Sequence, residues 1–226
     1  MIKKVIQQLN QIHEHLVSGR LGICRGESKK QFYDSGALQC EMIFDDKKNG
    51  QIKIFYENGV LLAELLFKNG KREKETKMYF ETGGLLSETA YQNGMIVGPE
   101  KMYFVSGALQ KWHQYINDLK EGEAKDFYES GVLKYLYNYK NGQKEGEAKH
   151  YYECGALQFE GCYINGQLDG ESKKFYEDGT IESVNNYRDG QFDGVVKMFS
   201  VSGDLQYLFN YKNGQLEGEP MDFTEN

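Results

Sequence analysis

The sequence predicts an all-β protein, an elongated single antiparallel sheet of about eight 24-residue β-hairpin repeats with a helical cap at the N-terminus. Three observations support this fold class. A glycine recurs at a fixed spacing, aromatic and leucine residues hold fixed positions around it, and a second turn motif follows each of these blocks. Strand, turn, strand, turn without interruption is typical of an antiparallel meander.

The period is carried by a turn glycine. From the second repeat onward the glycines are 24 residues apart, at Gly59, Gly83, Gly107, Gly131, Gly155, Gly179 and Gly203, and Gly36 begins the series. An aromatic residue stands four positions before each of these glycines, and Leu or Ile stands two positions after it. The second turn reads Asn-Gly or Asp-Gly at Gly70, Gly94, Gly142, Gly166, Gly190 and Gly214, with Asn117-Asp118 in that slot of the fourth unit.

The fifth unit shows how each repeat is expected to fold. Residues 122–128 form one strand, 129–131 turn the chain, and 132–139 form the second strand. Asn141-Gly142 then reverses the chain again, because both central residues of a type I′ turn need a positive φ. Neither half exceeds about nine residues between turn signals and the apolar spacing is two, so a helix within the repeat is not expected.

Both ends of the chain are expected to be caps. Residues 1–19 place Ile and Leu at helical spacing before Ser18-Gly19, which predicts an amphipathic helix lying on the first repeats. The repeat domain then covers 20–226. Residues 218–223 begin a ninth unit and stop after its first strand, where Pro220 suits an edge strand that does not pair with a second copy. A monomer is therefore expected.

Composition and charge restrict the function classes. The chain carries 27 Lys and Arg against 34 Asp and Glu, a net charge of −7, which argues against generic nucleic-acid binding. No apolar run is long enough to span a membrane. No export signal is present, so we expect a cytoplasmic protein whose four cysteines stay as free thiols.

Sequence motifs for catalysis or for a bound cofactor are missing. The four histidines do not follow the period, and no HExxH, G-x-S-x-G or phosphate-loop motif occurs. The cysteine spacings contain no CxxC. We therefore expect no enzyme activity, no cofactor and no metal site.

The repeat unit G-E-x-K-x-F/Y-Y-E-x-G-x-L-x(5)-Y-x-N-G resembles the MORN repeat variant, as in the bacterial YwqK-type antitoxin proteins. The resemblance runs from about Gly22 to Phe223, nearly the whole chain, and the sequence departs from it at Lys74, where a glycine is expected. It implies an elongated sheet of hairpins that serves as a non-catalytic scaffold, with an antitoxin-like or immunity-like role and a toxin as one expected partner. A weaker likeness to choline-binding repeats is disfavoured, because those cages are rich in Trp and this chain has only Trp112.

Two sets of residues are candidates for binding. The first contains ring side chains in second strands at places where other units carry Ser, Asn or Thr, namely Trp112, His113, Tyr135, Tyr137, Tyr207 and Phe209. Trp and Tyr are favoured anchors in protein interfaces, so these residues predict a protein partner.

The second set is a lysine that recurs in every unit and predicts a row for an anionic ligand, at Lys77, Lys101, Lys125, Lys149, Lys173 and Lys197. Two interpretations of this row stay open. The lysines either pair across strands with glutamates such as Glu75 and Glu123 and pack on rings, or they meet anionic lipid or an acidic partner. Protein binding by a repeat scaffold is the predicted function, and peripheral binding to anionic lipid is the alternative.

Overall fold

The computed structural model describes residues 28–45 and 48–224, and the chain divides into two compact units, one ending at Val97 and one beginning at Gly98. All regular structure within the described residues is β-strand. The predicted N-terminal helix over 1–19 lies outside the described residues.

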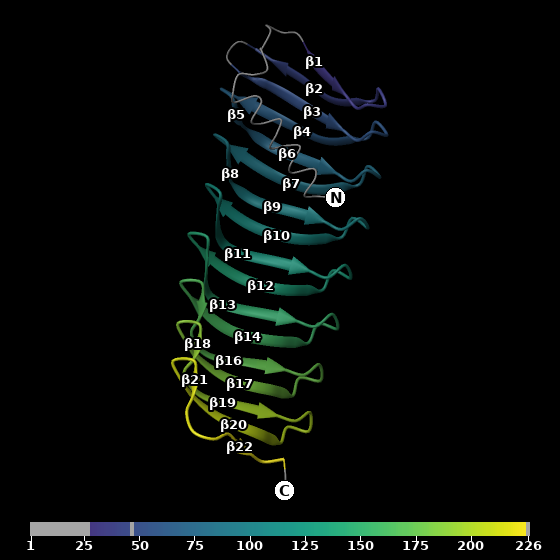
Figure 1. Cartoon of the computed structure of the whole chain (residues 1–226). Helices are drawn as coiled ribbons and strands as arrows, with labels where there is room; N and C mark the ends of the chain where they lie inside the picture. The colour runs from purple at the N-terminus through teal and green to yellow at the C-terminus, as the bar shows by residue number, and fades with distance from the viewer. Residues whose placement is uncertain (1–27, 46–47, 225–226) are drawn as a thin grey trace. The chain divides into compact units, whose positions relative to one another are not determined.

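Each unit is an antiparallel meander in which consecutive hairpins pair side by side (Figure 1). Unit 1 contains β1 (Lys29–Phe32), β2 (Leu38–Phe44), β3 (Gly50–Phe55), β4 (Leu61–Lys68), β5 (Lys71–Arg72), β6 (Lys74–Tyr79), β7 (Leu85–Gln92) and β8 (Met95–Ile96). Unit 2 contains β9 (Gly98–Tyr103), β10 (Leu109–Ile116), β11 (Leu119–Phe127), β12 (Leu133–Lys140), β13 (Gln143–Tyr151), β14 (Leu157–Ile164), β15 (Gln167–Leu168), β16 (Gly170–Phe175), β17 (Ile181–Arg188), β18 (Gln191–Phe192), β19 (Gly194–Phe199), β20 (Leu205–Lys212), β21 (Gln215–Leu216) and β22 (Met221–Asp222).

The predicted turns are confirmed by their backbone angles. Asn141 has φ 50° and Gly142 has φ 80°, so both central residues of the turn take the left-handed conformation that Asn-Gly favours. In the fourth unit Asn117 (φ 50°) and Asp118 (φ 68°) take the same conformation without a glycine. The second-turn motif therefore fixes the hairpins as the sequence predicts.

The strands are more numerous than the repeat pattern suggests, because a residue of positive φ follows soon after each second turn. Gly98, Gly170 and Gly194 occupy this position, with φ between 73° and 111°, and a two-residue strand precedes each of them. Gly122 has φ 79° at the equivalent place, yet β11 continues through it. Lys74 stands where the pattern expects a glycine and takes φ 66°.

Hydrogen bonds between equivalent positions link successive repeats. The second aromatic residue of a repeat donates its hydroxyl to a backbone carbonyl of the next repeat at 2.8 or 2.9 Å, in the pairs Tyr33–Phe55, Tyr56–Tyr79, Tyr128–Tyr151, Tyr152–Phe175 and Tyr176–Phe199. Phe80 and Phe104 occupy this position in the third and fourth repeats and have no hydroxyl to donate. The ladder of tyrosines is therefore interrupted in these repeats because phenylalanine replaces tyrosine, and not because the hairpin changes.

A second ladder runs along the Asn-Gly turns. The first turn residue donates its backbone N–H to a side-chain oxygen of the preceding repeat at 2.7 to 3.5 Å, in the pairs Asn69–Asn49, Asn93–Glu73, Asn141–Glu121, Asn165–Glu145, Asp189–Asp169 and Asn213–Asp193. The following glycine donates to a backbone carbonyl of the preceding repeat, as Gly142 does to Lys120 at 2.9 Å. Each turn is therefore held by the repeat before it.

The fully buried apolar residues lie mainly in unit 1. A single cluster contains Cys40, Met42, Phe44, Ile52, Ile54, Leu62, Ala63, Leu65 and Phe67, each between 0% and 7% exposed. Phe44 and Phe67 meet with ring centroids 5.5 Å apart. Burial raises the pKa of the Cys40 thiol, which keeps it protonated and unreactive at neutral pH.

Replacing Lys74 with glycine should stabilise the protein. The left-handed region costs a residue other than glycine roughly 1 kcal/mol, and a glycine avoids most of that penalty. We expect Lys74→Gly to raise the free energy of unfolding in urea by about 0.5 kcal/mol. Lys71→Gly is the matched control, because Lys71 is exposed in β5 and has no positive φ. That variant should lose stability, and a loss in both variants would contradict the account.

Removing one tyrosine hydroxyl should weaken the link between two repeats. Tyr152→Phe deletes the donor to the Phe175 carbonyl and leaves that carbonyl without this partner. We expect a loss of about 1 kcal/mol in the free energy of unfolding. Tyr151→Phe removes the neighbouring hydroxyl, which makes no hydrogen bond among the described residues, and should be nearly neutral. Equal losses in the two variants would show that the hydrogen bond of the Tyr152 hydroxyl is not the cause of the lost stability.

Candidate binding faces of unit 2

Unit 2 presents two chemically different faces, which the strand register defines. Residues directly opposite each other on neighbouring strands point to the same side of a sheet. One side carries a row of residues that includes rings and is aligned in register, running Lys111, Asp126, Tyr135, His150, Phe159, Lys174, Ser183, Met198, Tyr207 and Asp222. The other side carries the row Lys101, Trp112, Lys125, Leu136, Lys149, Glu160, Lys173, Val184, Lys197, Leu208 and Met221. We call the first the aromatic face and the second the lysine face.

The predicted ring residues are divided between these faces. Tyr135 and Tyr207 lie directly in the row of the aromatic face, and His113, Tyr137 and Phe209 lie on the same side, two residues further along their strands. Trp112 lies on the lysine face, opposite Lys101 and Lys125. From the sequence alone the six residues form one set, because the face on which each side chain lies follows only from the register of every strand.

The centre of the aromatic face is a cluster of rings around His150. The Tyr137 hydroxyl and His150 Nε2 are 2.7 Å apart. The His150 ring lies 4.8 Å from the Tyr135 ring and 4.7 Å from the Phe159 ring, measured between centroids. Burial, helped by the nearby Lys144 ammonium, lowers the pKa of His150 to about 4. His150 is therefore neutral at pH 7, and the tautomer of its ring decides whether Nε2 accepts from or donates to the Tyr137 hydroxyl.

A second pair lies one hairpin earlier. His113 Nε2 is 2.6 Å from Asp126 Oδ1, and His113 is only 9% exposed. Burial pushes the pKa of Asp126 upward, but the bond and charge of His113, with Lys111 and Lys120 nearby, outweigh it and leave that pKa below its usual value. Asp126 is thus ionised at neutral pH and engaged by His113.

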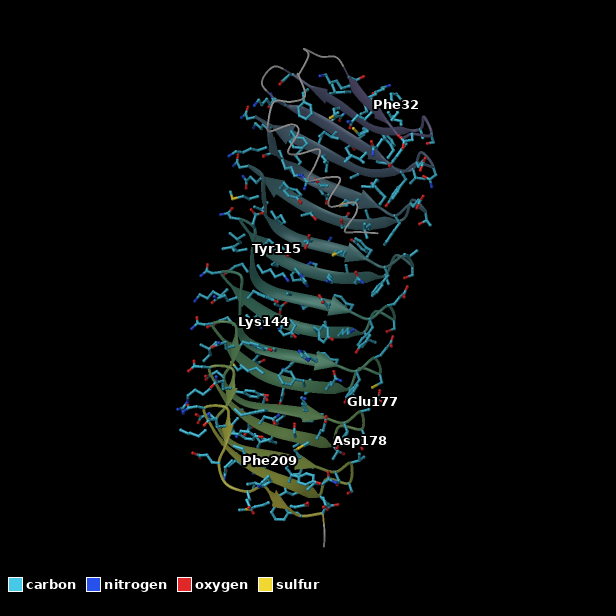
Figure 2. All side chains as sticks on the ribbon, viewed as in Figure 1. Phe32, Tyr115, Lys144, Glu177, Asp178 and Phe209 are labelled. Carbon is cyan, nitrogen blue, oxygen red and sulfur yellow. The ribbon has the colours of Figure 1, made fainter. Side chains whose placement is uncertain are left out.

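A ridge of rings and cations borders this cluster on the side of the Asn-Gly turns. It consists of Tyr115, Lys120, Tyr139, Lys144 and Tyr163, and it continues as Leu168, Tyr187, Phe192, Tyr211 and Leu216. Figure 2 labels Tyr115 and Lys144 toward that edge of unit 2, whereas Glu177 and Asp178 lie at the turns of the opposite edge. We call the first five residues the lysine–tyrosine ridge. Lys120 and Lys144 were not among the predicted site residues, although both lie two residues after an Asn-Gly or Asn-Asp turn, where the other repeats carry Arg72, Ile96, Leu168, Phe192 and Leu216. Arg72 also lies over a tyrosine ring, 4.7 Å from the centroid of Tyr91.

The lysine face is largely neutralised by its own carboxylates. Lys125 pairs with Glu123 at 2.6 Å, Lys149 with Glu147 at 3.5 Å and Lys173 with Glu171 at 3.1 Å. These pairs form two residues apart along one strand, so the prediction of pairing across strands is wrong for these three lysines. Lys125 also lies over the Trp112 ring, 5.5 Å from its centroid.

The remaining lysines of the predicted row differ in their neighbours. Lys77 in unit 1 pairs with Glu75 on its own strand at 3.6 Å and with Glu88 across strands at 3.0 Å. Two positions before Lys197 stands Val195, and two positions before Lys101 stands Pro99, where Lys77, Lys125, Lys149 and Lys173 have a glutamate. The row is therefore not a continuous band of positive charge, because Lys77, Lys125, Lys149 and Lys173 each pair with a glutamate.

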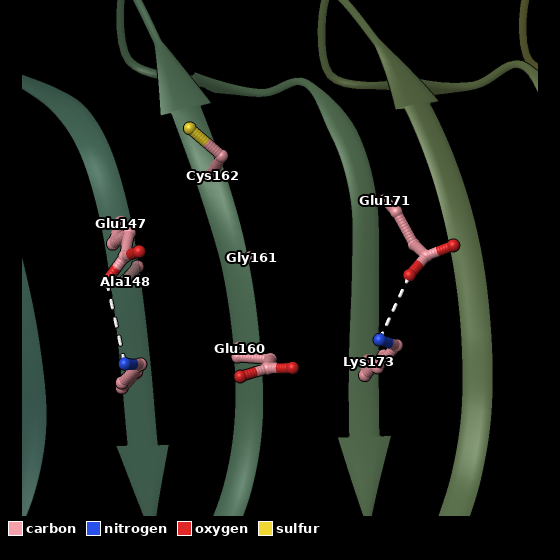
Figure 3. A pocket seen from close by; sticks show the side chains of 8 residues that line it. Glu147, Ala148, Glu160, Gly161, Cys162, Glu171 and Lys173 are labelled. Atoms are coloured by element: carbon pink, nitrogen blue, oxygen red, sulfur yellow. Dashed lines mark ion pairs between the residues drawn. The ribbon is translucent and has the colours of Figure 1, made fainter.

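A shallow hollow of about 280 Å³ opens on the lysine face (Figure 3). Its charged lining consists of Glu147 and Lys149 from β13, Glu160 from β14, and Glu171 and Lys173 from β16. Figure 3 shows the two ion pairs, one on each side of the strand that carries Glu160 and the Cys162 thiol. Three carboxylates against two ammonium groups leave this hollow acidic, which does not suit an anionic ligand.

The described residues contain no set of three or more His, Cys, Asp or Glu side chains arranged to hold a metal ion. Among those same residues there is also no helix long and apolar enough to cross a membrane. The two histidine pairs are hydrogen-bonded within an open face and not within an enclosed pocket, so what the face offers chemically is ring surface, hydrogen bonds and the ammonium groups of Lys111, Lys120, Lys144 and Lys174.

Comparison with known proteins identifies the repeat. The model of the MORN repeat variant family matches residues 48–69, 72–93, 120–141, 144–165 and 168–189, together just under half of the chain. The chain thus contains five repeats of this variant, which confirms the resemblance at the level of the repeat. None of the curated proteins matches the sequence significantly.

Solved structures give weaker likenesses. The crystal structure of TcdB2-TccC3 is 14% identical with a TM-score of 0.24, and that of TcdB2-TccC3-Cdc42 is 13% identical with a TM-score of 0.18. Each match covers 82% of this chain but only 12% of the other chain. At these TM-scores the likeness supports no conclusion about fold or function.

The depressed pKa of His150 should make the protein sensitive to mild acid. In the unfolded chain this histidine takes up its proton near pH 6.5, whereas in the folded protein its pKa is about 4. The unfolded state therefore binds the proton more readily, and stability falls as pH drops from 6.5 toward 4. Asp126 contributes only at lower pH, because its pKa lies below the ordinary 3.8.

Urea unfolding at pH 7 and pH 5 tests this prediction. The wild type should lose stability between the two values, and His150→Gln, which keeps an acceptor for Tyr137 but cannot be protonated, should lose clearly less. Parallel losses in the two proteins would assign the acid sensitivity to other groups.

Proposed function

We propose that this protein is a non-catalytic repeat scaffold that binds a protein partner through the aromatic face of unit 2. The observation that carries the proposal is the ring cluster of Tyr135, Tyr137, His150 and Phe159 on an open face of the sheet. Every described element of unit 2 is a strand or a connection between strands, so no second layer of described residues packs on this face.

The cluster has the properties of a protein-binding surface. Rings that are already packed against one another lose little conformational entropy on binding and present a large apolar area. Tyr207 and Phe209 extend the same face toward β20 with ring centroids 6.1 Å apart. A partner lying along the face could contact both groups at once.

The class of partner is inferred from the resemblance to YwqK-type antitoxin proteins. The resemblance also implies a non-catalytic scaffold, which fits a protein that acts by occupying another protein. We infer an antitoxin-like or immunity-like role in which the partner is a toxin. This part of the proposal rests on the resemblance alone.

Binding to anionic lipid through the lysine face is the alternative, and the ion pairs count against it. Lys125, Lys149 and Lys173 each have a glutamate on the same strand within 3.5 Å. A membrane would have to break these pairs or meet the glutamates as well.

Two single substitutions separate the faces. We expect Tyr135→Ala to weaken binding of the partner by at least about tenfold, as truncation of a central ring at an interface does. Trp112→Ala, on the lysine face, should change the affinity for the partner by no more than about twofold. The partner is first captured from native cells at physiological salt with the tagged full chain and identified by mass spectrometry. Its affinity for each variant is then measured with purified proteins, after circular dichroism has shown that both variants keep their strands.

Three outcomes contradict the proposal. The first is the lack of a stoichiometric protein partner, and the second is loss of binding with Trp112→Ala but not with Tyr135→Ala. The third is flotation with anionic liposomes that disappears at high salt, which would support the lipid alternative.

A further inference from the structure

Four lysines of the aromatic face differ from Lys125, Lys149 and Lys173 of the lysine face, each of which forms an ion pair with a glutamate. Lys111, Lys120, Lys144 and Lys174 all lie on this side of unit 2, and no carboxylate of the described residues comes within ion-pair distance of any of them. Two carboxylates lie beside His113 on this face: Asp126, which His113 engages at 2.6 Å, and Glu100, which is opposite His113 in the strand register. An acidic protein thus keeps four lysines without an ion pair on one open face, where Asp126 and Glu100 act on Lys120 from beyond ion-pair distance.

Two of these cations are held against rings in the lysine–tyrosine ridge. The Lys144 ammonium is 3.5 Å from the centroid of the Tyr137 ring and 4.8 Å from that of Tyr163. The Lys120 ammonium is 4.9 Å from the centroid of Tyr139. Burial lowers the pKa of both lysines, which means that holding these charges partly out of water costs free energy. An arriving carboxylate would offset that cost more than it would at a fully solvated lysine.

We propose that the lysine–tyrosine ridge binds an extended acidic segment of the partner protein, with carboxylates on Lys120 and Lys144 and with the tyrosine rings flanking them. This inference rests on the proposed function, and it names the chemistry that the partner must carry.

The repeat fixes the spacing of those carboxylates. Lys120 and Lys144 hold the same position in successive repeats, two strand spacings apart, which is about 9.6 Å. A chain in the polyproline II conformation makes one turn about every three residues and rises about 3.1 Å per residue, so acidic residues three positions apart point to the same side, about 9.3 Å apart. The segment therefore carries Asp or Glu at positions i and i+3 and runs across the strands.

The continuation of the ridge predicts which residues come after the acidic pair in the bound segment. Leu168 and Phe192 take the places that Lys120 and Lys144 hold in the earlier repeats, and Phe192 contacts the rings of Tyr187 and Tyr211 at 4.7 and 5.1 Å. The ridge thus changes from cationic to apolar along unit 2. A matching segment has its acidic residues at one end and apolar residues at the other.

A nucleic acid fits this surface less well. Single strands also use rings and cations, but they need a groove of positive charge that follows every phosphate. The ridge offers two ammonium groups, then only apolar side chains, in a chain of net charge −7. The acidic protein segment is therefore the occupant that the observations favour.

Fluorescence anisotropy with synthetic peptides tests the inference. The probe is a labelled 14-residue peptide with glutamates at i and i+3 near one end and Leu and Phe at the other. The comparison peptide has glutamine in place of both glutamates. We expect the full-length protein to bind the acidic probe at least tenfold more tightly than the glutamine peptide.

Two double variants with the same net charge locate the site. Lys120→Gln with Lys144→Gln should abolish the preference for the acidic probe. Lys125→Gln with Lys149→Gln removes two charges from the lysine face and should leave the preference intact. Equal effects in the two variants would reduce the binding to general electrostatics and overturn the inference, as would no preference for glutamate or tighter binding of a single-stranded oligonucleotide of the same length.

The same variants separate this inference from the proposed function. If the captured partner binds the Lys120→Gln, Lys144→Gln protein as tightly as the wild type, then the scaffold proposal stands and the acidic-segment inference fails. If no partner is captured but the acidic probe still binds at the ridge, then the inference about ligand chemistry stands and the proposed protein partner fails.

Discussion

Hydrogen bonds between equivalent positions of neighbouring repeats are the constraint on which the rest of each unit depends. A sheet of one described layer has little depth in which to bury side chains, so the repeats must be held mainly along the sheet. The tyrosine hydroxyls at one edge and the turn amides at the other provide this, with spans of 23 and 20 residues respectively. These bonds form only if every repeat keeps the same length between its turns, and this requirement explains why the 24-residue period is so strict in the sequence.

The fold was predictable from residues with strong local conformational preferences. Residues whose role depends on side chains of neighbouring strands did not allow such a prediction. The glycines and asparagines of the turns need a positive φ whatever surrounds them, so their spacing alone predicts the hairpins and the antiparallel order. Lys74 shows the limit of that logic, because it takes a glycine conformation without being a glycine. The split strands arise from the same positive-φ position, which the sequence marks only weakly, as Gly98 and Gly170 do.

The candidate site was predictable in its residue types but not in its arrangement. The unusual rings were recognisable because they depart from the period, and five of the six lie on one face. Trp112 could not be separated from His113 as a binding residue without the register, since adjacent residues of a strand point to opposite sides. The lysine row was recognisable as a row, yet its ion pairs form along the strand with glutamates such as Glu123. Lys120 and Lys144 were missed because their role depends on rings contributed by other strands.

The same scaffold position carries different chemistry in the two units, and this difference is the reason for placing the proposed binding face in unit 2. In unit 1 the lysine row alternates with glutamates, Lys53 with Glu64 and Lys77 with Glu88, so its charges compensate one another. The other face of unit 1 holds fully buried apolar residues such as Ile52 and Ile54. In unit 2 the corresponding inner positions carry Tyr137, His150 and Phe159, which are larger, partly polar and only partly buried except for Phe159. A repeat needs only small or apolar residues there to pack, as Ala124 and Ala148 show. Half-buried rings, a neutral histidine and lysines without an ion pair cost folding energy at positions where simpler residues suffice, and the proposed binding of a protein partner gives a reason to keep them.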